Sequence, residues 1–267
     1  MQPLIPFNHI NLIGEGIMRG VTVVLPTAEV QNLLPHGLEL GEQRLTPSGT
    51  HPILLFFYDM LRVHMSVPTL LPSMSYREHL VGVPHAYVAP GPMGSARSGP
   101  FFFIPRLYLD NYLPTLGGVL FWGFAKQMAN ITITQDRYAV SGTSGESLIS
   151  LDLKPTGDSR PITHYASFEP IYHILCQPLV TQVPLAVGPW FAASMFDKKW
   201  STAELQPLST VVRIHQAFVP GLPCGRFPAE GCAAGIDQSP LGSFVLKTRW
   251  RSSLIHPPSL HAQPFSR

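Results

Sequence analysis

Short apolar runs separated by turn residues dominate the pattern of hydrophobic and polar positions along this chain. Some runs alternate with a period of two, as where threonines separate Ile131 from Ile133, which is typical of half-buried β-strands. Others are continuously apolar, and "PILLFFYDMLRVHM" at 52–65 indicates one long strand or a bent pair of strands. The spacing of the turn residues favours antiparallel pairing. We therefore predict strands at 21–25, 52–65, 84–90, 101–109, 130–140, 147–153, 209–219 and 243–255.

Few segments have the pattern of a helix. The stretch 27–35 places Thr27 as an N-cap before apolar positions at helical spacing, and it predicts a short helix. The stretch 118–129 also predicts a short helix, although its glycines weaken this tendency. Two prolines interrupt the apolar stretch 178–196, so we expect loop and core packing there. The longest loop-like segment is 220–242. The fold class is mainly β, with a few short helices.

Composition indicates a compact protein with a large core. Of its 267 residues, 45% are hydrophobic and only 13% are charged, about half the usual charged fraction. The 28 prolines therefore indicate turns and strand ends rather than disorder. A chain of this length can bury its core without disulfide bonds. We find neither a repeat nor a domain break, and we predict a single domain, residues 1–267.

Charge and targeting signals exclude several classes of function. The net charge is +2, and no basic run is interleaved with aromatic residues, so we expect no nucleic-acid partner. The pattern of a signal peptide is missing, and no apolar run is long enough to span a membrane. We therefore expect a cytoplasmic protein with no membrane partner. Three cysteines are too few for a disulfide framework, although Cys224 and Cys232 flank one loop and could pair.

The common catalytic motifs are missing from the chain. There is no G-x-G-x-x-G after a strand and no phosphate-binding P-loop, and "GTSGES" at 142–147 lacks the G-x-S-x-G spacing of a nucleophile elbow. The histidines occur singly, with no H-x-x-x-H or C-x-x-C spacing. We therefore expect no metal site.

One lysine lies in an unusual setting. Lys126 belongs to "GGVLFWGFAKQMANI", residues 117–131, an aromatic run without other charges. Its side chain could snorkel, with its stem on apolar surface and its head in water. Alternatively, burial would lower the pKa of the amine from about 10.4 and supply the neutral nucleophile that forms a Schiff base. Lys154 and the Lys198–Lys199 pair have acidic neighbours in the sequence, and we predict that they lie on the surface.

The residues around Lys126 resemble the acetoacetate decarboxylase family. Members carry Y-L-D-N, then G-R-E, then the lysine motif, and Tyr108 to Asn111 read Y-L-D-N at the family's distance from Lys126. The segment 73–84, "SMSYREHLVGVP", resembles the family's Y-x-E segment. The resemblance implies that Lys126 is the Schiff-base lysine and that Glu78 is an active-site glutamate. The arginine before that glutamate could instead form an exposed ion pair with it.

Further site residues follow from the same resemblance. An active-site arginine precedes the first family strand, which makes Arg19 the candidate for binding substrate. Tyr76 would share a face with Glu78 in an extended segment, and Trp122 is a candidate for the wall of the substrate pocket. The resemblance spans residues 19–255 as a divergent member. It implies an acetoacetate decarboxylase-like antiparallel sheet or β-barrel around a central cavity, a homo-oligomer, and a reaction that needs no metal or organic cofactor.

The chain departs from the family pattern around the lysine. Gln127 stands where the family has a second lysine, so desolvation alone would have to lower the pKa of the nucleophile. Val119 and Leu120 replace the arginine and glutamate of G-R-E, and Ala125 replaces a proline. The family's other strand glutamate has no clean match in "FFYDM", residues 56–60. These departures are compatible with imine chemistry and favour a substrate other than acetoacetate.

Three functions remain open at this level. The first is a Schiff-base lyase in which Lys126 forms an imine with a small keto acid and a β-keto acid loses CO₂ into that imine. Glu78 would orient the substrate or move protons, and Arg19 would meet the substrate carboxylate or hold Glu78. The second uses the same lysine for aldol condensation, dehydration or cyclisation of a keto acid or polyketide-like substrate. The third is a non-catalytic protein that binds an apolar carbonyl ligand.

Overall fold

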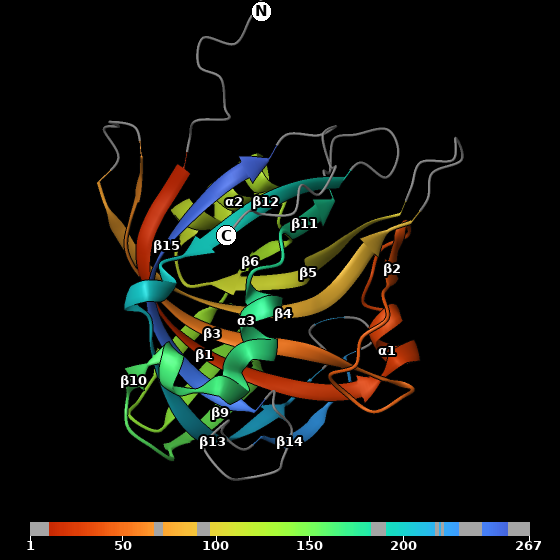
Figure 1. Cartoon of the computed structure of the whole chain (residues 1–267). Coiled ribbons are helices and arrows are strands. Elements are labelled where there is room, and N and C mark those ends of the chain that lie inside the picture. Colours follow the sequence, from red (N-terminus) through yellow and green to blue (C-terminus); the bar gives the residue numbers. More distant parts are fainter. Residues whose placement is uncertain are drawn as a thin grey trace, which may run out of the picture.

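Strands make up most of the secondary structure, as the sequence pattern predicts (Figure 1). The computed structural model describes residues 11–66, 72–89, 97–182, 191–216, 219, 222–229 and 242–255. All fifteen strands within these ranges belong to one sheet.

Seven strands of this sheet close into a barrel, which confirms the predicted fold class. Neighbours in the ring are antiparallel except β5 and β11, which are parallel, and the ring closes where β1 pairs with β15. In ring order the strands are β1 (Asn11–Pro26), β3 (Thr50–Met65), β4 (Met74–Val88), β5 (Ser98–Leu109), β11 (Leu179–Gln182), β12 (Phe191–Lys198) and β15 (Ser243–Ile255).

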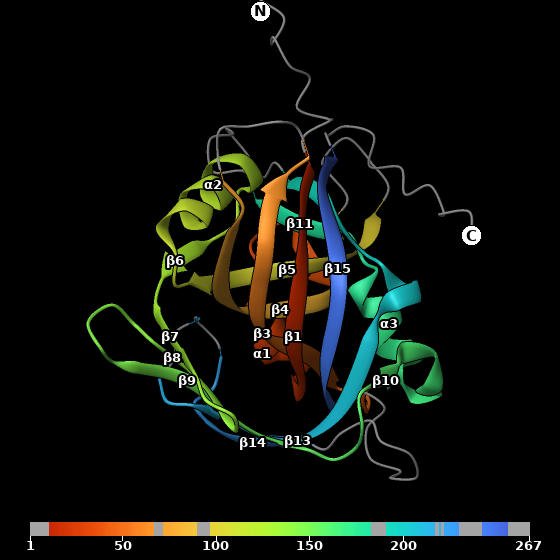
Figure 2. The same ribbon diagram turned by 90° about the vertical axis from the view of Figure 1, so that its left-hand side faces the viewer.

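The remaining strands form a second layer and two short additions. β13 continues the sheet from β15, followed by β9, β8 and β7, while β10 and β14 also pair with β13. This layer passes beneath the barrel in Figure 2. The short strands β2 and β6 pair with β4 and β5. The bounds are β2 (Leu38–Leu40), β6 (Lys126–Met128), β7 (Asn130–Ile133), β8 (Arg137–Ser141), β9 (Ser147–Pro155), β10 (Arg160–Pro161), β13 (Glu204–Ile214) and β14 (Gly225–Ala229).

Strand β3 shows why some runs are apolar throughout. Phe56 and Tyr58 pack with the side chains inside the barrel, whereas Phe57 packs with residues of the second layer. Because both faces are buried, the run 52–65 lacks the polar alternation of a half-buried strand. The predicted long strand is confirmed, with an irregular register near its C-terminal end.

Helices occupy few of the described residues. α1 is shorter than the predicted helix at 27–35, and Thr27 is its first residue, because Pro26 takes the N-cap position. α3, with seven residues, was not predicted. The α-helices are α1 (Thr27–Gln31), α2 (Tyr112–Trp122) and α3 (Glu169–Leu175), and the 3₁₀ segments are Ile162–His164, Ala166–Phe168 and Trp200–Thr202.

Several predicted segments differ from the structure. The stretch 118–129 is not one helix, because Gly123 adopts a left-handed conformation with φ of 66° that ends α2 before Lys126. The stretch 178–196 contains β11 and most of β12 rather than loop, because sheet pairing overrides the local proline signal. The strand predicted at 130–140 is the hairpin of β7 and β8, and β14 lies within the predicted loop 220–242.

Two further expectations concern cysteine pairing and membranes. The pairing considered for Cys224 falls on Cys232, which lies outside the described residues. None of the helices in the described ranges is long and apolar enough to cross a membrane.

Candidate active site

A cavity of about 350 Å³ lies inside the barrel. All seven barrel strands contribute lining residues, and parts of α2 and α3 complete its walls. Most of the lining side chains are aliphatic or aromatic, so charges inside the cavity are weakly screened. The carboxyl and amino groups among the lining residues belong to Glu78, Lys126 and Lys198.

A helix that ends abruptly brings Lys126 to this cavity. Asn111 caps α2 by accepting a hydrogen bond from the backbone N–H of Leu113 at 3.1 Å, and Gly123 ends the helix. The chain then enters β6, which runs parallel to β5. A Cβ on Gly118 would lie closer than 3.0 Å to three atoms of the Lys126 side chain. The Lys126 side chain can therefore occupy this position only because Gly118 has no side chain.

The Lys126 amine lies in the cavity wall rather than on the outer surface of the barrel. Its Nζ donates a hydrogen bond to Pro114 O at 3.1 Å and lies 5.8 Å from the centre of the Phe124 ring. Burial lowers the pKa of Lys126 below its usual value, and the attraction of Glu78 partly opposes this change. A lowered pKa raises the fraction of neutral, nucleophilic amine near pH 7.

Glu78 supplies a carboxyl group to the same cavity. It lies in β4, opposite Tyr58 of β3, and only 5% of the residue is exposed. Burial raises the pKa of Glu78 to about 7, and the attraction of Lys126 opposes the rise. A carboxyl with this pKa can both release and take up a proton near neutrality.

Tyr76 lies beside Glu78 in the cavity wall. The segment 73–84 lies mostly within β4, so Tyr76 and Glu78 share a face and both line the cavity, as the sequence predicts. Burial, and then repulsion from Glu78, raise the pKa of the Tyr76 hydroxyl well above its usual value. The hydroxyl therefore stays protonated near pH 7 and can donate a hydrogen bond to a ligand.

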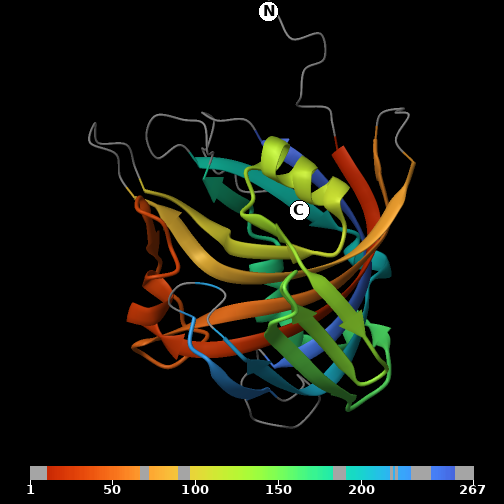
Figure 3. The same ribbon diagram turned by 180° about the vertical axis from the view of Figure 1, so that it is seen from behind.

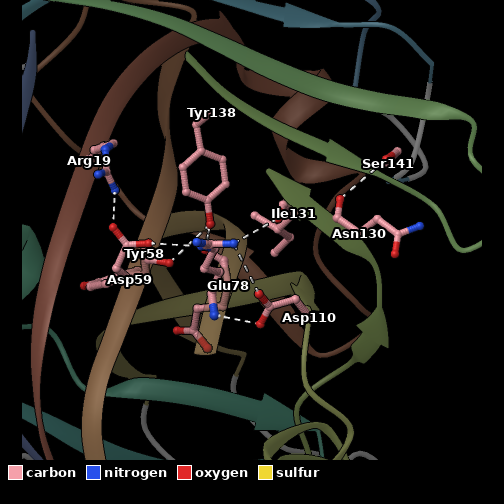
Figure 4. Close-up of polar contacts among 10 residues, drawn as sticks. Arg19, Tyr58, Asp59, Glu78, Asp110, Asn130, Ile131, Tyr138 and Ser141 are labelled. Carbon is pink, nitrogen blue, oxygen red and sulfur yellow. Dashed lines mark hydrogen bonds and ion pairs between the residues drawn. The ribbon is translucent and has the colours of Figure 1, made fainter. Parts of the chain in front are cut away.

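Arg19 lies on the other face of the barrel wall. It follows Met18, which packs inside the barrel, so its own side chain faces the second layer. Nη1 of Arg19 donates to Oδ2 of Asp59 at 3.0 Å, and the guanidinium lies 5.7 Å from the centre of the Tyr138 ring (Figure 4). Arg19 is not among the described residues that line the cavity. The structure thus does not bring it together with Lys126.

A polar network holds this outer face together (Figure 4). Nε of Arg77 lies 3.7 Å from Asp59, and the Arg77 backbone N–H donates to Asp110 at 2.8 Å. The Tyr138 hydroxyl donates to backbone oxygens of β3 and β4, both at 3.2 Å. The exposed Arg77–Glu78 pair considered from the sequence does not form, because neighbouring strand residues point to opposite faces. The network stabilises the wall behind the cavity.

Two predictions about the site concern Trp122 and metal ions. Trp122 is the last residue of α2, but its side chain is outside what the structure describes, so its place in the pocket wall stays a prediction. Within the described part of the chain, no three His, Cys, Asp or Glu side chains are grouped to hold a metal ion.

The prediction that Lys198 lies on the surface is wrong. Lys198 is the last residue of β12, and it lines the cavity together with Phe196, two residues earlier on the same face. Its neighbour Lys199 is exposed, as predicted. Phe196 and Lys198 are two residues apart, so the two-residue period of a strand places both side chains on one face. The prediction of loop over 178–196 hid this relation.

The fold and site define a class of protein: a closed β-barrel whose apolar cavity contains a buried amine near a buried carboxyl group. A comparison with known families matches residues 14–175 to "Acetoacetate decarboxylase (ADC)". This match covers more than half of the chain, and the protein therefore belongs to the acetoacetate decarboxylase family. A comparison with curated proteins found no match.

Solved structures share the fold at low sequence identity. An acetoacetate decarboxylase matches with a TM-score of 0.59 and 10% identity, over 96% of this chain and 92% of that chain. The acetoacetate decarboxylase of Legionella pneumophila gives 0.57 and 13%, over the same shares. The enduracididine biosynthesis enzyme MppR, in complex with pyruvate, gives 0.53 and 14%, over 94% and 90%. These likenesses support the barrel assignment.

Proposed function

We propose that this protein is an enzyme that acts on a keto acid through an imine on Lys126. The observation that carries the proposal is the Lys126 amine, buried in an apolar cavity with a lowered pKa and accompanied by Glu78. Membership of the acetoacetate decarboxylase family supports it. The complex of the similar enzyme MppR with pyruvate supports a keto acid as the substrate class.

The favoured reaction is decarboxylation of a β-keto acid. The neutral Lys126 amine adds to the ketone, and loss of water leaves a protonated imine. The electrons of the carbon–carboxylate bond then move into the iminium as CO₂ departs, which leaves an enamine. A proton adds to carbon, and water hydrolyses the imine to release the ketone and the free amine. Glu78, with a pKa of about 7, takes and returns protons in these steps.

Burial, rather than a neighbouring cation, lowers the pKa of Lys126 in this proposal. Gln127 is exposed and uncharged, so burial is the main cause of the lowered pKa of Lys126. Arg19 contributes indirectly in this proposal, since its ion pair with Asp59 supports the wall that carries Glu78. Binding of the substrate carboxylate therefore falls to another group.

Condensation is the second candidate reaction. The similar enzyme MppR was solved with the condensation product of pyruvate and imidazole 4-carboxaldehyde. In this reaction the protonated imine on Lys126 would lose a proton from its α-carbon to Glu78 instead of losing CO₂. The resulting enamine would attack an aldehyde carbon, and loss of water would follow. Release of CO₂ from a β-keto acid separates the two reactions, because condensation releases none.

Borohydride trapping tests the proposal. A panel of β-keto and pyruvoyl acids is incubated with the protein and sodium borohydride, and peptide mass spectrometry locates the adduct. We expect reduction to fix the substrate on Lys126 and expect Lys126→Met to abolish it while circular dichroism stays unchanged. Lys154→Met, at an exposed lysine, is the matched control and should trap normally. Trapping that survives Lys126→Met, or no trapping with any carbonyl compound, would overturn the proposal; the second result would favour a binding protein.

A further inference from the structure

A second amine lines the cavity, and no step above uses it. Nζ of Lys198 donates to Leu175 O at 3.1 Å and to Phe196 O at 3.4 Å. It also lies 5.1 Å from the centre of the Phe196 ring and 5.7 Å from that of Trp200. An ammonium has three N–H donors, so these two contacts leave one for a ligand. No acidic side chain in the described ranges lies within 4.0 Å of this amine.

Lys198 and Lys126 reach the cavity from different sides. Lys126 lies beside β5 and under α2, whereas Lys198 contacts the C-terminal end of α3. In Figure 2, α2 and β6 lie on the side of the barrel opposite α3, and in the view from behind in Figure 3 α2 lies across the near side of the barrel. The walls of the cavity are largely aliphatic and aromatic. A ligand that reaches both amines must therefore carry polar groups at two ends of an apolar body.

The charge of Lys198 favours an anionic partner. Burial lowers its pKa to about 8, and nearby Cys176 and Asp197 oppose the change. The amine is therefore mostly protonated near pH 7. The Asp197 side chain is exposed on the other face of β12. A cation in an apolar cavity without a direct counter-ion is stabilised when an anion binds beside it.

We propose that Lys198 binds a carboxylate of the substrate, remote from the carbonyl group that reacts with Lys126. The identity of the reacting carbonyl rests on the function proposed above. The substrate class is an elongated keto acid in which an apolar segment separates the ketone from this carboxylate, and the carboxylate stays attached throughout the reaction. A cavity of about 350 Å³ is within the range that takes drug-sized ligands and suits such a molecule.

Calorimetric titration with decanoate tests the anion site without any imine chemistry, since decanoate has no ketone. We expect Lys198→Met to weaken binding about tenfold to a hundredfold and expect Lys126→Met to retain it. Lys199→Met, at the exposed neighbouring position, is the matched control and should bind like the wild type. Failure of the wild type to bind decanoate, undiminished binding by Lys198→Met, or loss of binding only in Lys126→Met would overturn the proposal.

A neutral ligand separates anion binding from a structural role of Lys198 at the end of α3. 1-Decanol should bind the wild type and Lys198→Met equally, whereas a disrupted cavity would weaken both ligands together and count against the proposal. If the methionine variant does not fold, Lys198→Gln takes its place. Lys198→Arg keeps the charge and should recover most of the affinity for decanoate.

Trapping with paired ketones then tests the substrate class. 9-Oxodecanoate should label Lys126 at about tenfold lower concentration than 2-decanone, and Lys198→Met should remove that advantage. Equal labelling by the two ketones in the wild type would refute the remote carboxylate site. If no ketone labels Lys126 but decanoate binding still depends on Lys198, the proposed function fails and the anion site stands.

Discussion

Replacement of Glu78 by glutamine tests the electrostatics of the cavity. The carboxyl has a pKa of about 7 in the folded protein, against its usual 4.5. This difference corresponds to ~3 kcal/mol of lost stability once the carboxyl is ionised in both folded and unfolded chains. Below pH 4.5 the carboxyl is protonated in the folded and the unfolded chain, and the folded protein keeps this stability in full. The stability is lost as the pH rises through 7, where Glu78 ionises in the folded protein. Because glutamine is uncharged and similar in shape, Glu78→Gln should be more stable than the wild type at pH 8.

Urea unfolding followed by circular dichroism between pH 5 and pH 8 measures this effect. We expect the stability advantage of Glu78→Gln over the wild type to widen by about 2–3 kcal/mol across that range. Glu42→Gln, at an exposed position, is the matched control and should show no such trend. An advantage that stays constant, or that shrinks as the pH rises, would refute the reasoning, because Glu78 would then ionise without a burial penalty.

Three further predictions concern the amine and the outer network. Gly118→Ala places a Cβ against Lys126, so borohydride trapping should fall about a hundredfold, while the fold loses at most about 3 kcal/mol of stability. Unchanged trapping would contradict the close contact. Glu78→Gln removes the attraction that opposes the lowered pKa of Lys126, so the pH midpoint of trapping should move downward, not upward. Arg19→Gln breaks the ion pair with Asp59 and should cost about 1–3 kcal/mol in urea unfolding while trapping persists; loss of trapping in a folded variant would place Arg19 in the site.

Local patterns were sufficient for the parts of the fold with a strong period. The apolar run 52–65 forms a strand as predicted. The strand predicted at 84–90 is only the end of β4, which begins at Met74, and the earlier part of β4 places Tyr76 and Glu78 on one face, as expected of an extended segment. The predicted ends of helices and strands were less accurate where the backbone conformation of a single residue determined them. Gly123 ends α2 three residues before Lys126, so the lysine begins a strand instead of lying in a helix.

Pairing within the sheet produced strands where the prolines of the stretch 178–196 had predicted a loop. The stretch 178–196 has few local features of a strand, yet β11 pairs with β5, and β12 pairs with both β11 and β15. Pairing partners far apart in the sequence supply the hydrogen bonds that stabilise these strands. Because the strand β12 was not predicted, the two-residue alternation that turns the Lys198 side chain into the cavity was not recognised.

The sequence by itself determined a mainly β fold, the lysine in its aromatic run, and the glutamate two residues after Tyr76, because these depend on composition, short spacing and the two-residue period of a strand. Only the tertiary structure decided which face of each strand became the inside of the barrel. Closure of β1 against β15 placed Arg19 on the outer face and Lys198 in the cavity. The physical reason is that alternation separates the two faces of a strand, whereas burial of one face inside a barrel depends on pairings between distant segments.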